Sequence, residues 1–393
     1  MDRVKGMALT SSDLQFQVSE RAPLVLVSGP RSVGKSSFVC TLWGDSELLP
    51  TAERDCTQVN TLVRAPAEGD DEDRVRVVYL PRDRAYAFAV RDLSYHRLAT
   101  FLMETLGPLG PNLEAFPPED RLHKVIEAMR DLFRKRPDLL VLHDHLNDQI
   151  ERLEEFLAFV ASPSYQTGET VTMDWRGRRE QLMGQRRPDG RPIGIGRMLA
   201  VERVELIKGT GVWSRIPPQL MDTPWVPTFH NARRAELLLE EAREAHALML
   251  IARAGPFALQ GWVERLLAKR KELAARTLVI FNQVDTVDMS RLLARDGFSA
   301  AFDESMRTLG AVGIPVENVF VSCTRLPFLD KSASAEQHAK RIARLRDVLG
   351  TLRKRVVSAP ENAAPLLKPR LLRATEPDGG IEAVRERLIS LLP

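Results

Sequence analysis

A glycine-rich segment, GPRSVGKSS at residues 29–37, directly follows the apolar run 24–27. Two glycines separated by four residues and followed by Lys35 and Ser36 let a backbone curl so that its N–H groups face an anion. Lys35 would then neutralise phosphate charge, and Ser36 would hold Mg²⁺. A buried strand before the segment and a helical pattern at 37–43 favour this interpretation over an ordinary glycine-rich turn. The sequence therefore predicts a strand, a phosphate-binding loop and a helix.

Composition limits the classes of protein that remain. The 393 residues are 44% hydrophobic and 28% charged, which is typical of a globular chain with one large or two moderate domains. A formal net charge of +3 gives no general attraction for nucleic acid or an anionic membrane. Three cysteines without zinc-site spacing, no signal peptide and no apolar run of about 18 residues indicate a cytoplasmic protein.

Short apolar runs alternate with helical patterns from residue 24 onward, as in an α/β fold whose parallel sheet is covered by helices. Each run is continuous, which is typical of strands buried on both faces. The expected strands are 24–28, 219–222, 247–252, 277–282 and 319–322. The expected helices of this part are 233–245, 261–275, 336–356 and 380–392.

Residues 64–209 interrupt the alternation and are too many for one connection. Two runs, 60–65 and 75–79, flank an acidic turn and predict a hairpin. Further helices are expected at 93–106, 119–136 and 140–161, and a strand at 198–207. We interpret 64–209 as an insertion into one domain spanning 23–393, after an N-terminal extension at 1–22.

Four candidate groups follow the loop in chain order. Thr57 could bring its hydroxyl and carbonyl to Mg²⁺ and to an attacking water, and Asp222, after an apolar strand, is placed to hold Mg²⁺ through a water. Asp285, in Asn282-Gln283-Val284-Asp285, can accept the two N–H donors of a guanine edge, which adenine lacks. Ser322-Cys323-Thr324 can supply backbone N–H groups to a base oxygen. Each is ordinary alone, but ligands of open α/β sheets bind where successive strands end.

Together these motifs resemble the guanine-nucleotide motifs of a GTPase, and their details are similar to the dynamin-like family. The similar features are Ser36-Ser37 after Lys35, Ser32 inside the loop, the long insertion, and the segments 201–225 and 378–392. The resemblance extends over about 23–392 and is specific only at the motifs. It implies a P-loop GTPase fold, mostly parallel, with helices on both faces and a helical and hairpin insertion between the second and third motifs.

The resemblance also implies an activity: slow hydrolysis of GTP to GDP and phosphate with Mg²⁺, stimulated by dimerisation across the nucleotide face. Ser32, Lys35 and Thr57 would be catalytic, with Ser32 positioning a monovalent cation or water, and Ser36, Thr57 and Asp222 would hold Mg²⁺. The expected partner is a second copy or a partner dynamin-like subunit. The implied nucleotide-binding residues are Gly29, Arg31, Ser32, Val33, Gly34, Lys35, Ser36, Ser37, Trp225, Asn282, Gln283, Asp285, Ser322, Cys323 and Thr324.

Three residues depart from the family pattern. Trp225 replaces a glycine and restricts its loop, Gln283 replaces a lysine and loses its charge, and Arg31 replaces a common glutamine and could add a phosphate contact. We expect no stalk or lipid-binding tip of a membrane-remodelling dynamin in this sequence. Membrane remodelling is therefore expected only with a partner subunit or a longer chain, and membrane contact is possible but not indicated.

Other interpretations stay open. One is a GTP-gated binding module with negligible hydrolysis that acts through a partner subunit. Another is a P-loop ATPase or kinase with coincidental later motifs, which would be indifferent to Asp285. The arginine-rich stretch 176–203 could contact phospholipid or a nucleic-acid backbone or be a solvated loop, and no specific nucleic acid is predicted.

Overall fold

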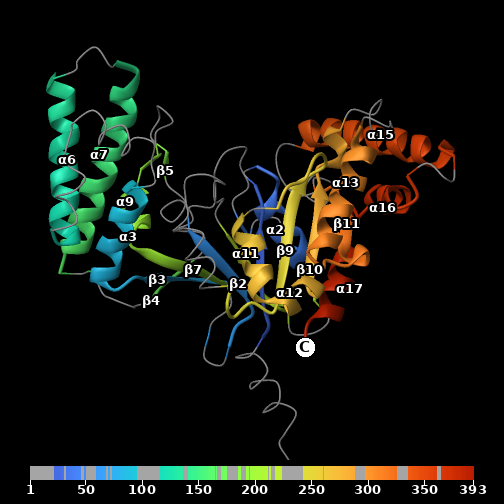
Figure 1. Cartoon of the computed structure of the whole chain (residues 1–393), viewed down its shortest axis with the longest axis horizontal. Coiled ribbons are helices and arrows are strands. Elements are labelled where there is room, and N and C mark those ends of the chain that lie inside the picture. Colours follow the sequence, from blue (N-terminus) through green and yellow to red (C-terminus); the bar gives the residue numbers. More distant parts are fainter. Residues whose placement is uncertain are drawn as a thin grey trace, which may run out of the picture.

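The structure is a computed structural model of the whole chain. It describes residues 22–30, 32–45, 48–49, 59–67, 70, 73–94, 116–135, 140–163, 165, 170–174, 185–186, 192–193, 195–210, 212–213, 217–223, 242–259, 261–287, 297–324, 335–360 and 364–393. Within this part the centre is a nine-stranded sheet in the order β11-β10-β9-β1-β8-β2-β7-β3-β4 (Figure 1).

The strands that carry the predicted motifs lie side by side and run parallel. β1 (Leu24–Ser28) pairs with β8 (Gln219–Asp222) and with β9 (Ala247–Arg253), and β10 (Thr277–Asn282) pairs with β9 and β11 (Val319–Val321). The carboxyl ends of all five strands therefore meet at one edge of the sheet.

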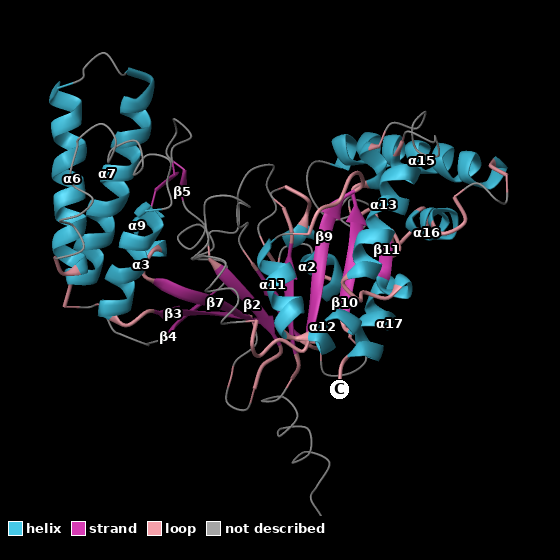
Figure 2. Ribbon diagram, in the orientation of Figure 1, coloured by secondary structure: helices cyan, strands magenta, loops and turns pink. Residues whose placement is uncertain are grey.

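Helices cover both faces of this part of the sheet (Figure 2). Alternate residues of a strand point to opposite faces, so Leu26 of β1 packs into one core while Val25 and Val27 pack into the other. The helices on the Val25 face are α2 (Lys35–Trp43) and α17 (Ile381–Leu391). Those on the Leu26 face are α11 (Gly261–Lys269), α12 (Lys271–Ala275), α13 (Phe298–Ala311), α15 (Ala335–Ser358) and α16 (Leu367–Ala374). The prediction of an α/β fold with a mostly parallel sheet is confirmed.

The predicted hairpin of 60–65 and 75–79 is wrong. β2 (Asn60–Arg64) and β3 (Arg74–Tyr79) belong to the same sheet, but β7 (Val201–Ile207) lies between them, parallel to β2 and antiparallel to β3. β2 itself pairs antiparallel with β8. The insertion therefore extends the central sheet, and β4 (Thr170–Asp174) forms its edge by pairing with β3.

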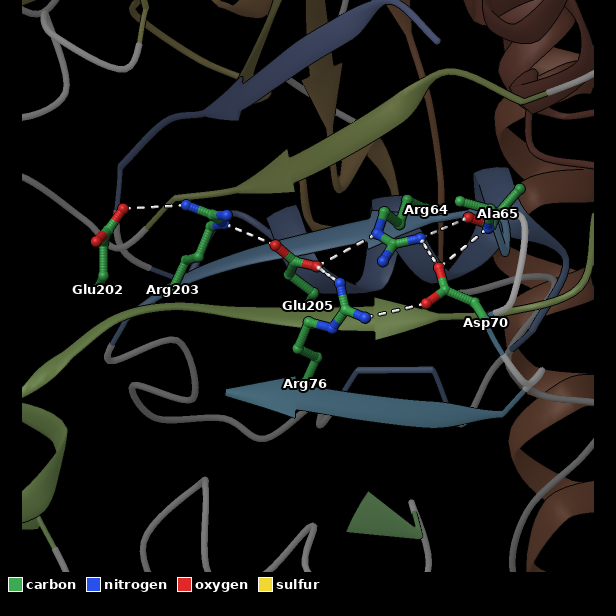
Figure 3. A network of polar contacts seen from close by, with 8 residues as sticks. Arg64, Ala65, Asp70, Arg76, Glu202, Arg203 and Glu205 are labelled. Carbon is green, nitrogen blue, oxygen red and sulfur yellow. Dashed lines mark hydrogen bonds and ion pairs between the residues drawn. The ribbon is translucent and has the colours of Figure 1, made fainter. Parts of the chain in front are cut away.

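An ionic network joins β7 to its neighbours β2 and β3 (Figure 3). Glu205 of β7 is 5% exposed. Its carboxylate accepts hydrogen bonds from Arg64 of β2 at 3.3 Å and Arg203 at 2.8 Å, and it lies 3.7 Å from Arg76 of β3. A carboxylate at this depth is tolerated only when it is paired, so the arginines on both neighbouring strands favour this position for β7.

The helices of the insertion form a separate group beyond β3 and β4 (Figure 1). They are α3 (Arg82–Ser94), α6 (Pro118–Lys135), α7 (Leu140–Ala161) and the short α9 (Ile195–Met198). Fully buried Leu122, Met129 and Phe156 lie in their shared core. A two-stranded sheet of β5 (Gln185–Arg186) and β6 (Pro192–Ile193) completes the insertion, and no helix in the described residues could span a bilayer.

Candidate functional site

The loop between β1 and α2 has the curled backbone that the sequence predicts. A Cβ on Gly29 would lie 2.0 Å from the carbonyl oxygen of Ile251 on β9, so only glycine fits at this close approach. Ser32 and Gly34 have φ angles of 58° and 87°, in the left-handed region. Such backbone concavities, followed by the unpaired N–H groups at a helix N-terminus, attract anions.

Lys35 and Ser36 lie at the first turn of α2. The side chain of Lys35 is largely buried, and its ammonium donates a hydrogen bond to the carbonyl of Pro30 at 3.0 Å, which holds it against the loop. The hydroxyl of Ser36 donates to Oδ2 of Asp222 at 2.6 Å. Two residues that are 186 positions apart therefore lie side by side where β1 and β8 end.

The Ser36 and Asp222 pair fits a Mg²⁺ ion. Hydroxyl and carboxylate oxygens are the ligands that Mg²⁺ prefers, and it commonly takes one or two from the protein and the rest from phosphate and water. Asp222 is fully buried, so its charge is shielded from bulk water. The described residues hold no cluster of three or more His, Cys, Asp or Glu side chains suited to a metal.

Asn282 and Gln283 connect the end of β10 to the phosphate loop. The buried amide of Asn282 donates to the carbonyl of Val33 at 2.9 Å and to the hydroxyl of Thr324 at 3.0 Å. The amide of Gln283, whose φ is 61°, donates to the carbonyl of Ser32 at 3.0 Å. The segments predicted to hold the phosphates and the base therefore touch.

Asp285 follows in the short helix η1 (Val284–Thr286), where the thiol of the buried Cys323 donates to its Oδ1 at 3.3 Å. The sequence predicts that backbone N–H groups of residues 322–324 bind a base oxygen. In the structure each of them donates inside the protein, to Phe281 at 2.9 Å, to Gly379 at 3.2 Å and to the side chain of Asn282 at 3.3 Å.

The turn before α17 is a part of the site that the sequence analysis missed. The carbonyl of Gly379 accepts hydrogen bonds from the Ser322 hydroxyl at 2.9 Å and from the Cys323 N–H. Gly379 has a φ of 66°, and a Cβ there would lie 2.4 Å from the Cys323 carbonyl oxygen. The Asp378-Gly379-Gly380 sequence signals such a turn, but only the fold shows what it contacts.

Three predicted residues, Arg31, Thr57 and Trp225, lie outside the described residues. Ser37 lies in α2, where its carbonyl accepts the hydroxyl of Thr41 at 2.9 Å. All other predicted site residues gather where β1, β8, β10 and β11 end. β1 also lies between β8 and β9, where the strand order reverses, which is where open α/β sheets bind ligands. These features are those of an α/β domain with a P-loop-like turn.

Comparison with known proteins gives a fold likeness only. No protein-family model matches the chain, and no curated protein matches it significantly. Among solved structures, it is similar to an oligomerised bacterial dynamin pair described as providing a mechanism for long-range sensing and tethering of membranes. The TM-score is 0.42 with 11% identity, over 88% of this chain and 41% of that one. A likeness at this level does not assign the chain to a family.

Proposed function

We propose that this chain binds GTP with Mg²⁺ and hydrolyses it slowly to GDP and phosphate. The observation that carries the proposal is the pair of amide bridges from Asn282 and Gln283 to the carbonyls of Val33 and Ser32. These bridges join the phosphate loop to the end of β10, and Asp285 follows Gln283 by two residues, in η1. A carboxylate there accepts the N1–H and N2–H donors of guanine, and adenine offers no such pair.

The other predicted site residues have separate roles in this proposal. The ammonium of Lys35 neutralises phosphate charge, together with the N–H groups at the N-terminus of α2. Ser36 and Asp222 hold Mg²⁺, which supplies a Lewis acid for the phosphate oxygens when it is bound. Ser32 would position a monovalent cation or water that stabilises charge at the bridge between the last two phosphates. Thr57, which lies outside the described residues, would orient the attacking water.

Titration calorimetry of the full chain with Mg²⁺ and GTP, GDP or ATP tests the proposal. We expect GTP and GDP to bind and ATP to bind at least about 100-fold more weakly, because a site built around specific hydrogen bonds rejects an analogue that lacks them. Equal or tighter binding of ATP would overturn the proposal, and so would an absence of GTP binding.

A second candidate function is a GTP-gated binding module with negligible turnover, which the bulky Trp225 in place of glycine favours. Single-turnover release of phosphate at several protein concentrations separates the two. A rate that rises with concentration supports a GTPase stimulated by dimerisation across the nucleotide face. GTP that stays intact at every concentration supports the binding module.

A further inference from the structure

We infer that the outer side of α15, with the start of α16, is a docking surface for an acidic amphipathic helix of a partner protein. The surface combines exposed basic side chains of α15 with three exposed aliphatic side chains near its end. In Figure 1 the two helices lie at the end of the molecule opposite to α6 and α7. No residue of the candidate nucleotide site belongs to this surface, so the inference does not depend on the proposed function.

The charge of these two helices is strongly unbalanced. α15 and α16 together contain ten lysines and arginines but two acidic residues, while the whole chain has a net charge of +3. Five of the basic side chains are exposed on α15, and none of the five forms an ion pair with another described residue. These five are Arg344, Arg346, Arg353, Lys354 and Arg355.

Exposed arginines on other helices of the chain are neutralised by a carboxylate one turn away. Arg134 pairs with Asp131 at 3.2 Å on α6, and Arg307 pairs with Glu304 at 2.5 Å on α13. On α15 three basic residues follow one another at 353–355, and like charges this close repel. The uncompensated positive charge of α15 therefore attracts an acidic partner.

The arginines form two rows along the outer side of α15. Arg346 and Arg353 are seven residues apart, close to two helical turns, and so lie in one row. Arg344 and Arg355 are eleven residues apart, close to three turns or about 16 Å along the axis, and lie in a second row. A helix that packs between the rows meets arginines on both of its flanks. Guanidinium groups bind carboxylates through two parallel hydrogen bonds, so this arrangement suits glutamates or aspartates on both flanks.

Exposed aliphatic side chains gather beside the end of α15. Among the residues described, four large hydrophobic side chains are exposed, and Val357 of α15, at 60%, is the most exposed of them. Two others adjoin α16: the guanidinium of Arg370 donates to the carbonyl of Leu366 at 2.5 Å and to that of Val316, in η2 (Val316–Asn318), at 2.6 Å. The ammonium of Lys368 donates to the carbonyl of residue 359 at 2.7 Å, which holds the start of α16 against the end of α15. The surface therefore offers apolar contacts as well as charge.

This combination favours an amphipathic helix over a lipid bilayer or a nucleic acid. A helix at a bilayer surface buries its own apolar stripe in the lipid, but Leu349, Leu352 and Val356 of α15 are already packed in the core of this chain. A nucleic-acid backbone would pair with the arginines and leave the exposed aliphatic side chains in water. A helix whose apolar stripe is flanked by carboxylates uses both features of the surface.

Fluorescence anisotropy with the full chain and a labelled synthetic peptide tests the inference. The peptide has about 20 residues, with leucines along one face of its helix and glutamates on both sides of them. One control peptide has serine in place of every leucine, and another has lysine in place of every glutamate. We expect the first peptide to bind, more weakly as the salt concentration rises, and each control peptide to bind at least about tenfold more weakly.

Paired variants of the chain locate the binding surface. Arg346→Glu/Arg353→Glu should weaken binding of the peptide at least about tenfold, because two attractions become repulsions. Arg265→Glu/Lys269→Glu, at exposed positions of α11, changes the net charge by the same amount and should bind within about twofold of wild type. Val357→Ser should weaken binding about threefold through lost apolar contact, and Val212→Ser, at an exposed position elsewhere, should not.

Several outcomes would overturn the inference. One is that the leucine and glutamate peptide does not bind the wild-type chain, and another is that the serine control binds as tightly, since the surface would then attract any polyanion. Equal losses in the α15 and α11 variants would mean that only net charge matters. Vesicles of phosphatidylglycerol or a double-stranded RNA that bind wild type more tightly than the peptide does, and bind Arg346→Glu/Arg353→Glu weakly, would assign the surface to lipid or nucleic acid instead.

Discussion

Lys35 is the residue on which phosphate binding should depend most. Its side chain is largely buried, and its ammonium donates a hydrogen bond to the carbonyl of Pro30 at 3.0 Å, within the loop itself. We expect Lys35→Ala to weaken GTP binding by about 100-fold or more, because charge-assisted contacts to phosphate are lost, and to shift the unfolding temperature little. Calorimetry and thermal unfolding measure both effects. Lys269→Ala, at an exposed position of α11, is the matched control and should bind GTP normally.

Asp285 should decide which base is accepted. Asp285→Asn replaces an acceptor that matches the 2-amino group of guanine with an amide that can donate to the 2-oxo group of xanthine. We expect the preference between GTP and xanthosine triphosphate to reverse in competition binding. Asp303→Asn, on the exposed side of α13, should keep the wild-type preference. An unchanged preference in Asp285→Asn would show that the base lies elsewhere.

Asp70 gives the ionic network a defined pH dependence. Burial alone would raise the pKa of its carboxyl, but hydrogen bonds from Arg64 and the Ala67 N–H, with the charges of Arg64 and Arg76, lower it below the ordinary 3.8. Because the pKa of Asp70 is lower in the folded than in the unfolded state, its ionised carboxylate stabilises the fold at pH values above the unfolded-state pKa. This stabilisation is lost as the pH falls through the folded-state pKa.

Urea unfolding between pH 7 and pH 3 should therefore show a narrowing difference between wild type and Asp70→Asn. The variant should be less stable at neutral pH, and the gap should close only below about pH 3.8, as Asp70 of the wild type takes up its proton. A gap that stays constant over the whole range would mean that the Asp70 charge does not stabilise the network.

At the scale of the elements, Glu205 should hold β7 between its neighbours. Glu205→Gln removes the buried carboxylate that Arg64, Arg76 and Arg203 share. The more peripheral Asp70 and Glu202 then remain as the partners of these arginines. We expect Glu205→Gln to lower the free energy of unfolding by about 3 kcal/mol, as when one partner of a buried pair is removed. Glu202→Gln, whose more exposed side chain pairs with Arg203 alone, should cost below about 1 kcal/mol. Urea titration compares the two variants, and equal losses would contradict a special role for Glu205.

The central strands could be predicted from the sequence because each is a short, continuous apolar run. β1, β8 and β10 have the predicted bounds, and β9 and β11 differ from them by one residue at the end. Periodicity likewise predicted α7 at 140–161, whereas the helix expected at 93–106 falls mostly outside the described residues. Before it, α3 was missed, because its few large apolar side chains give a weak pattern.

Pairing was harder to predict than the strands themselves. The runs that form β2 and β3 are close in sequence and therefore favour a hairpin. The strand that separates them, β7, comes about 130 residues later. Its buried Glu205 pairs with an arginine on each neighbouring strand. The site shows the same limit. Its motif residues were predicted from spacing, whereas the contact of Gly379 with residues 322–323 depends on a turn more than 50 positions away.

At the scale of the whole molecule, the hydrophobic cores of the described residues are separate, so we expect each core to stabilise its own part of the chain. Two clusters lie on the faces of the central sheet, and a third fills the helices of the insertion. Phe156 and Phe302 are both fully buried, but Phe156 packs against Tyr86 of α3 and Phe302 packs against Phe281 of β10, next to Asn282. Replacing either phenylalanine with alanine should lower the free energy of unfolding of the part of the chain around it by about 3–5 kcal/mol.

The two variants should differ in how they affect nucleotide binding. We expect Phe156→Ala to speed hydrogen exchange in α3, α6 and α7 while leaving GTP affinity within about twofold of wild type, because no predicted site residue lies in that core. Phe302→Ala should speed exchange in β10 and weaken GTP binding, because it loosens the strand that carries Asn282 and the turn that carries Asp285. If Phe156→Ala weakened GTP binding as much as Phe302→Ala, the insertion and the nucleotide site would be energetically coupled, and the independence of the two cores would be refuted.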